Sequence, residues 1–102
     1  MAKKIKVVVN RPNEEYGHMT NISDSLENLQ KTVEGYIEVY PLADDVVIIC
    51  NEEGRLRNLE PNFSILGGPQ FYGTVIFAGI DGEEFADLPM NFREFKERFF
   101  CN

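Results

Sequence analysis

The sequence has little of what would indicate catalysis or metal binding. It contains no Trp, a single His (His18) and two Cys (Cys50 and Cys101) among 102 residues. A structural zinc site needs about four clustered Cys or His ligands, and two cysteines this far apart form no recognisable disulfide framework. We therefore expect no metal and no cofactor. Cys50 is predicted to be a buried thiol and Cys101 a loose terminal one, both in a reducing cytoplasm.

Long hydrophobic runs and an excess of positive charge are also missing. No apolar run approaches the ~18–20 residues of a membrane helix, and the first four residues lead into a strand pattern without a signal peptide. Ten Lys and Arg stand against 17 Asp and Glu, so the formal net charge is −7. Nucleic acids and anionic membranes are bound by basic surfaces. We expect a cytoplasmic protein that binds neither nucleic acid directly nor a membrane.

Catalytic patterns are absent as well. No Ser or Cys forms a nucleophile elbow or a triad with His18. Gly67-Gly68 is followed by Pro69 and not by the Lys-Ser/Thr of a phosphate-binding loop. Acidic pairs occur beside turn signals, where solvated charge is expected, at Asp44-Asp45, Glu52-Glu53 and Glu83-Glu84. We predict no catalytic residue and a protein that is not an enzyme.

What the chain does contain is enough apolar sequence for one folded domain, residues 1–102. The hydrophobic content of 43% is too high for a disordered tail, and the length is that of one domain. Six segments have strand patterns: 4–10, 19–22, 36–40, 46–50, 71–80 and 84–85. Short connections between them favour hairpins. We therefore predict an α+β fold, with a mainly antiparallel sheet of about 4–6 strands and two helices.

The first predicted helix covers about residues 24–34. Asp24 is a good N-cap, and Glu27 has the spacing of a capping box. Leu26, Leu29 and Val33 then recur as one apolar stripe, and Gly35 stands where a left-handed C-cap belongs.

The second predicted helix covers about residues 91–100. Asn91 and Glu94 have the capping-box spacing. Phe92, Phe95 and Phe99 form its apolar stripe. Because the strands 46–50 and 71–80 are apolar on both faces, they need cover from the two helices on opposite faces or from another subunit. The second possibility leads us to expect a homo-oligomer.

The most distinctive candidate site lies on the strand 36–40. Tyr36, Glu38 and Tyr40 share one side, and Ile37 and Val39 share the other. Two aromatic rings beside a carboxylate could stack a planar ring and accept its hydrogen bonds. The alternative is that both tyrosines pack under a helix or a subunit, with Glu38 at the rim.

Two arginines follow the next turn. Arg55-Leu56-Arg57 is expected to begin a return strand with Leu56 facing the core, before an irregular segment 58–70. If that strand lies beside 36–40, Arg55 and Arg57 could meet phosphate groups.

Two blocks of sequence carry a resemblance to a known family. GYIEVYPL at 35–42 and DVVIICNEEG at 45–54 resemble domain-of-unknown-function family 3846, and Pro61-Asn62 and Gly73-Thr74 also suit that pattern. The resemblance covers nearly the whole chain. It implies an accessory protein of bacteria, phages and mobile elements, and it brings no established catalytic residues.

From the residues and this context we expect a non-enzymatic phage or mobile-element accessory protein in the bacterial host cytoplasm. Its target would be a host protein, reached through the acidic surface and the aromatic strand face. One alternative is a small-molecule or nucleotide sponge that counters host defence signalling, using Tyr36, Glu38, Tyr40, Arg55 and Arg57. Residues 12–54 carry a net charge of −9, which also allows a protein that imitates DNA. A small hydrolase or nuclease is the remaining alternative.

Overall fold

A six-stranded antiparallel sheet forms the centre of the protein. The computed structural model describes residues 3–65 and 67–100. Five strands follow one another in the order β2 (His18–Ser23), β1 (Lys4–Asn10), β7 (Val75–Asp81), β4 (Val46–Asn51) and β3 (Ile37–Ala43). The short strand β8 (Glu84–Ala86) pairs with β7 on the side that β1 also uses. The predicted α+β fold with a mainly antiparallel sheet is confirmed, and Cys101 lies outside the described residues.

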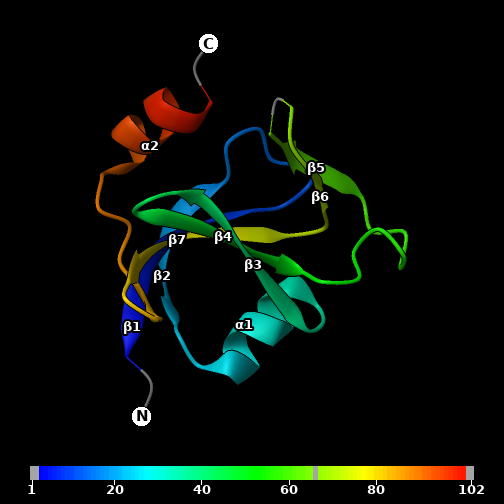
Figure 1. Ribbon diagram of the computed structural model, residues 1–102, viewed down its shortest axis with the longest axis horizontal. Coiled ribbons are helices and arrows are strands. Elements are labelled where there is room, and N and C mark those ends of the chain that lie inside the picture. Colours follow the sequence, from blue (N-terminus) through cyan, green and yellow to red (C-terminus); the bar gives the residue numbers. More distant parts are fainter. Residues whose placement is uncertain (1–2, 66, 101–102) are drawn as a thin grey trace.

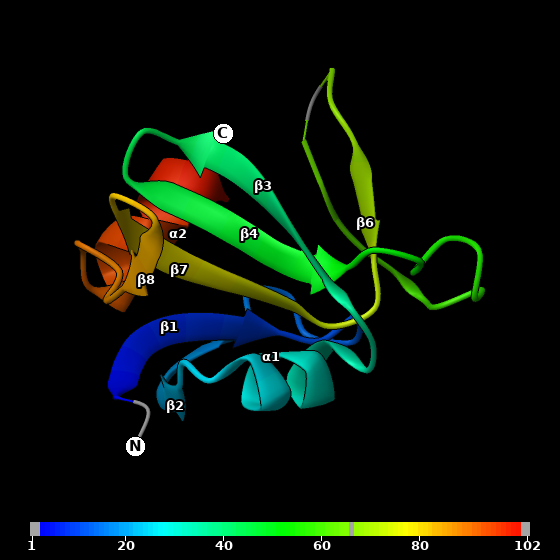
Figure 2. The ribbon, with the colours of Figure 1, turned by 60° about the horizontal axis from the view of Figure 1, so that its bottom comes forward.

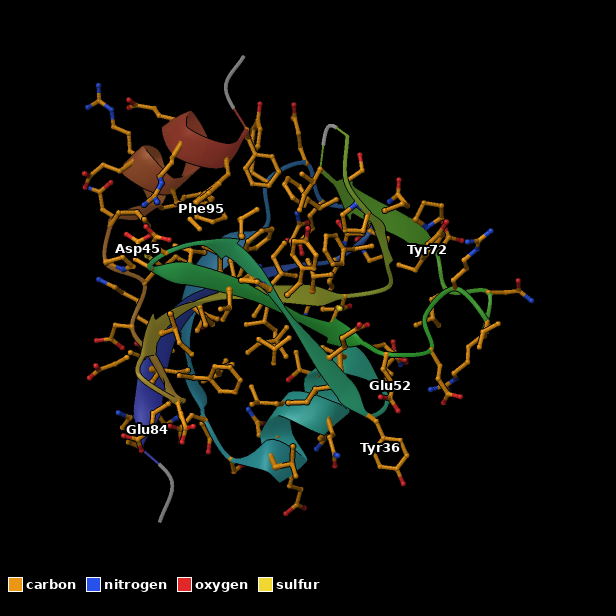
Figure 3. All side chains as sticks on the ribbon, viewed as in Figure 1. Tyr36, Asp45, Glu52, Tyr72, Glu84 and Phe95 are labelled. Atoms are coloured by element: carbon orange, nitrogen blue, oxygen red, sulfur yellow. The ribbon has the colours of Figure 1, made fainter. Side chains whose placement is uncertain are left out.

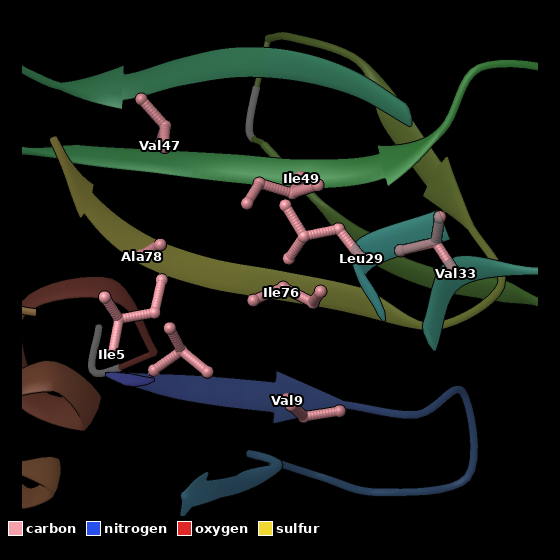
Figure 4. Close-up of a cluster of buried hydrophobic side chains, with 9 residues drawn as sticks. Ile5, Val9, Leu29, Val33, Val47, Ile49, Ile76 and Ala78 are labelled. Carbon is pink, nitrogen blue, oxygen red and sulfur yellow. The ribbon is translucent and has the colours of Figure 1, made fainter. Parts of the chain in front are cut away.

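One face of the sheet is covered by helix α1 (Leu26–Val33). Alternate residues of β1, β4 and β7 point to this side, where Leu29 and Val33 pack on them (Figure 4). In β1, Ile5, Val7 and Val9 are buried in this layer, and Val8 is buried in the layer on the opposite face.

The opposite face is covered by helix α2 (Phe92–Phe99) and by a separate hairpin of β5 (Pro61–Ser64) and β6 (Gln70–Tyr72). Phe95 is fully buried against Phe77, with ring centroids 4.9 Å apart. Figures 1 and 2 show α1 and α2 on opposite sides of the sheet. The apolar strands are thus covered within the chain itself and need no second subunit for that purpose; the homo-oligomer stays a prediction.

The second helix begins as predicted, but the first does not. Asn91 and Glu94 form the expected capping box. In α1, however, the N-cap is Ser25 and not Asp24, because the Ser25 hydroxyl accepts the Asn28 N–H at 3.2 Å. This start leaves Leu26 58% exposed, so the predicted stripe reduces to two buried residues.

The end of α1 also differs from the prediction. Glu34, with φ of 64°, is the left-handed residue, and Gly35 is not. Gly35 is needed for another reason. A Cβ there would lie 2.5 Å from Asn51 Nδ2 and 2.9 Å from Arg57 Nη1, so the glycine lets both side chains reach the end of the helix.

Three predictions for the strands are corrected. Arg55-Leu56-Arg57 is a series of turns and not a return strand, and Leu56 is 82% exposed. The segment 58–70 contains β5 and the start of β6. The predicted strand 71–80 is two strands, since Gly73 with φ of 79° breaks it.

Strand β3 continues beyond the predicted segment 36–40. It reaches Ala43, with a register shift between Pro41 and Ala43. Proline is tolerated there because β3 is an edge strand.

Neither α1 nor α2 has the length and apolar character that a membrane-spanning helix needs, and the described residues contain no other α-helix.

Candidate functional site

A hollow of about 420 Å³ lies between the β3–β4 pair and the β5–β6 hairpin. Its walls come from three parts of the chain that are distant in sequence. They are the side of β3 that carries Glu38 and Tyr40, the end of β4 with the turn that follows it, and strand β6. The lining residues are Glu38, Tyr40, Cys50, Asn51, Glu52, Gly54, Arg55, Pro69, Gln70, Phe71 and Tyr72.

The first wall follows from the antiparallel register. Glu38 pairs with Cys50 and Tyr40 pairs with Ile48, so alternate residues of both strands point to this face. Phe71 from β6 meets the Tyr40 ring edge-on, with centroids 5.6 Å apart. Tyr40 thus lines the hollow and also packs against the hairpin. Its role in binding stays a prediction.

The opposite wall is held in place by amide side chains. Asn62 Nδ2 donates to the carbonyl oxygens of Asn10 at 2.9 Å and Gly73 at 2.7 Å, which ties the hairpin to β1. Gln70 Nε2 donates to the carbonyl oxygens of Asn62 and Phe71, both at 2.8 Å. These bonds join the two hairpin strands, and Phe71 of β6 contacts Tyr40 of β3.

Cys50 and Asn51, two buried residues at the end of β4, also line the hollow. Both polar atoms of the Asn51 side chain form hydrogen bonds within the protein. Nδ2 donates to the carbonyl oxygens of Val33 and Glu34, and Oδ1 accepts the Glu53 N–H. The Cys50 thiol is buried, and this burial, helped by the negative charge of Glu38, raises its pKa to about 11. A thiol of this kind is protonated at neutral pH and is a poor nucleophile.

The structure brings together only three of the five predicted site residues. Glu38, Tyr40 and Arg55 line the hollow. Tyr36 and Arg57 lie beside the end of α1, in a smaller hollow of about 260 Å³. Figure 3 shows Tyr36 pointing outward from the start of β3, away from Tyr72. Arg57 has a structural contact, since its Nη1 donates to the Glu34 carbonyl oxygen at 2.6 Å.

Sequence reasoning missed the contribution of the hairpin. Gln70, Phe71 and Tyr72 form a whole wall, and Glu52 adds a second carboxylate. One signal for the hairpin was present. The breaker Gly67-Gly68-Pro69 lies between two short segments, 61–64 and 70–72, which pair antiparallel.

Outside the hollow, several of the described charged side chains contact one another through hydrogen bonds and ion pairs. His18 Nδ1 lies 3.2 Å from Glu14 Oε2, and Arg98 binds Asp45 at the far end of the sheet. Across residues 3–65 and 67–100, no three His, Cys, Asp or Glu side chains gather as a metal site would require. The groups that the hollow offers to a ligand are aromatic residues, the two carboxylates of Glu38 and Glu52, and the guanidinium of Arg55.

The fold defines a small α+β protein whose antiparallel sheet has one helix on each face, with a polar and aromatic hollow beside the edge strand β3. The family described as "Domain of unknown function (DUF3846)" matches residues 5–100, and the chain belongs to this family. No curated protein and no solved structure matches the chain.

Proposed function

We propose that this protein is a non-enzymatic binding protein that captures a host protein by adding an extended segment of that partner to the free edge of β3. The observation that carries the proposal is the character of this edge. β3 ends the sheet, and among the described strands none pairs with its outer side.

The hydrogen-bonding groups of this edge can be assigned from the register. The Glu52 N–H donates to the Tyr36 carbonyl oxygen, so Glu38 and Tyr40 also direct their backbone groups to β4. Ile37 and Val39, at the alternate positions, direct their N–H and C=O groups outward. Pro41 occupies the next outward position, where its missing N–H costs no internal hydrogen bond. The free edge therefore offers a short pairing segment that ends at Pro41.

Exposed apolar side chains surround the same edge. Tyr36 is 67% exposed and Val39 is 42% exposed, and no residue of the other edge strand, β2, is among the exposed large hydrophobic residues. In strand addition, backbone hydrogen bonds supply affinity and neighbouring side chains supply specificity. The net charge of −9 over residues 12–54 favours a partner segment with basic side chains.

A proline substitution tests this function directly. Val39→Pro removes one outward N–H without breaking a bond to β4, whereas Val39→Thr keeps the N–H and the branched shape. We expect tagged wild-type protein and Val39→Thr to retain the same dominant partner from a bacterial host lysate, and Val39→Pro to lose it. Equal capture by all three would contradict strand addition.

A second measurement covers the case in which Val39→Pro does not fold. In the free wild-type protein the Ile37 and Val39 amides should exchange rapidly with solvent, because they lack partners. Bound partner should protect both. Unchanged exchange in the purified complex would exclude pairing at this edge.

The origin in a phage or mobile element belongs to the same proposal, and its support is the context that the family resemblance implies. A small nucleotide-like ligand is the second candidate function. It is favoured by the convergence of Glu38, Tyr40 and Arg55 in the hollow.

A further inference from the structure

The hollow beside β3 has the size and composition of a small-ligand site. Its volume of about 420 Å³ lies within the range of roughly 300–1,000 Å³ that is usual for such sites. It uses side chains on the face of β3, and not the outward backbone groups to which we assign partner binding. A ligand there is consequently separate from strand addition, and the inference rests on the second candidate function, a nucleotide-like ligand in this hollow.

Three of the lining residues are aromatic. Tyr40, Phe71 and Tyr72 come from both walls, and the edge-on contact of Phe71 supports the Tyr40 ring. A half-exposed ring supported from behind can stack a planar heterocycle with little loss of conformational entropy.

The charged part of the lining is unpaired. Within residues 3–65 and 67–100, the side chains of Glu38, Glu52 and Arg55 form no hydrogen bond or ion pair. Arg57 differs, since it is held by the end of α1. The hollow therefore presents two free acceptors and one free cation together with its rings.

We propose that this hollow binds a guanine nucleotide. The ring stacks on Tyr40, the Glu38 carboxylate accepts its hydrogen bonds, and Arg55 binds the phosphate. Glu38 and Tyr40 are two positions apart on one strand face, about 7 Å, which suits a carboxylate at the edge of a stacked ring. Guanine presents two adjacent N–H donors that match the two oxygens of a carboxylate. Adenine has an acceptor nitrogen beside its amino group, and a carboxylate repels that acceptor.

Calorimetric titration of the purified protein with GMP, AMP and guanosine tests the proposal. We expect GMP to bind at least about tenfold more tightly than AMP, which corresponds to about one hydrogen bond. Equal affinity for GMP and AMP, or no binding of either, would overturn it.

Variants assign the roles of the three residues. Glu38→Gln should weaken GMP binding about ten- to a hundredfold, since a charge-assisted bond is lost. Arg55→Ala should weaken GMP but leave guanosine unchanged, because only the phosphate contacts Arg55. Tyr40→Leu should weaken both. An Arg55→Ala protein that loses guanosine and GMP equally would contradict the phosphate assignment.

Matched controls lie outside the hollow. Glu27→Gln and Arg93→Ala change the same residue types at exposed positions that do not line it, and both should keep wild-type affinity. Thermal unfolding checks that every variant is folded. Val39→Pro should bind GMP normally, so failure of nucleotide binding and failure of partner binding are distinguishable.

Discussion

The side chain of Asn51 joins the end of α1 to the end of β4. Its Nδ2 donates to the Val33 carbonyl oxygen at 3.1 Å, a contact that is buried and spans 18 positions in the sequence. The same nitrogen reaches the Glu34 carbonyl oxygen at 3.2 Å, and Oδ1 accepts the Glu53 N–H at 2.8 Å. The Asn51 amide thus supplies a hydrogen-bond donor to the last carbonyl oxygens of α1. It also orders the turn that places Glu52 and Arg55 at the hollow.

Replacing this amide should therefore reduce stability. We expect Asn51→Leu to lower the free energy of unfolding by roughly 1–3 kcal/mol, because buried carbonyl and N–H groups lose their partner. Urea denaturation measures the change. Asn21→Leu, on an exposed position of β2, should stay within about 0.5 kcal/mol of wild type. Similar values for both variants would show that the Asn51 contacts do not matter.

Arg98 and Asp45 form a two-bond ion pair between α2 and the β3–β4 turn. The distances are 2.7 Å from Nη2 to Oδ1 and 3.1 Å from Nη1 to Oδ2. Hydrogen bonding to Arg98 lowers the pKa of Asp45 below its ordinary value of 3.8. The ion pair therefore contributes fully to the free energy of unfolding at pH values above the ordinary pKa of Asp45. This contribution is lost as the pH falls through the lowered pKa.

Because both side chains are nearly half exposed, we expect Arg98→Ala to cost less than about 1 kcal/mol near neutral pH. The difference from wild type should shrink in acid, as measured by denaturation at several pH values. Arg93→Ala, which removes the more exposed pair with Glu97, is the control. A difference for Arg98→Ala that is independent of pH would contradict the ion-pair explanation.

We expect the free energy of unfolding to fall in alkali because of the Cys50 thiol. Burial raises the pKa of its thiol from an ordinary value of 9.0 to about 11, so the folded state holds the proton more tightly than the unfolded state. The stability from this thiol is complete below the ordinary value and is lost progressively as pH rises toward the raised one. Cys50→Val should show a smaller loss between these limits in urea denaturation. Equal pH dependence in both proteins would show that Cys50 does not titrate in this way.

Gly79 lies where the chain following β8 crosses β7. A Cβ there would overlap the Asp87 carbonyl oxygen, which is backbone and cannot turn aside. We expect Gly79→Ala to lower the free energy of unfolding by about 1–3 kcal/mol. Gly82→Asn is the comparison, since that position has open space and a φ of 64° that Asn tolerates. Gly82→Asn should lower the free energy of unfolding, measured by thermal unfolding, much less than Gly79→Ala does. A larger loss for Gly82→Asn would contradict the overlap expected at Gly79.

Local patterns predicted most of the fold. The alternation in residues 4–10 and the unbroken apolar run 46–50 identified β1 and the central strand β4. Asn91 and Glu94 identified the start of α2. These predictions succeeded because strand alternation and helix capping depend on residues only a few positions apart.

The candidate site was predicted in part. Tyr40 and Glu38 were recognised from one strand, but their neighbour Phe71 comes from a hairpin about thirty positions later. Arg57 has the same chemistry as Arg55, yet its guanidinium is held by the Glu34 carbonyl oxygen. Composition does not distinguish two arginines that differ only in what the fold places beside them.

Local sequence identified both helices, the strands β1 to β4 and β8, and the two-sided burial of β4 and β7, because hydrophobic periodicity indicates which faces are buried. It did not identify β5 or the break between β6 and β7. The tertiary structure was needed to show which turn residues share a hollow, which arginine forms no side-chain hydrogen bond or ion pair among the described residues, and that β3 lies at an edge of the sheet. Those outcomes depend on strand order and on long-range side-chain contacts such as that of Asn51 with Val33, and no local pattern encodes them.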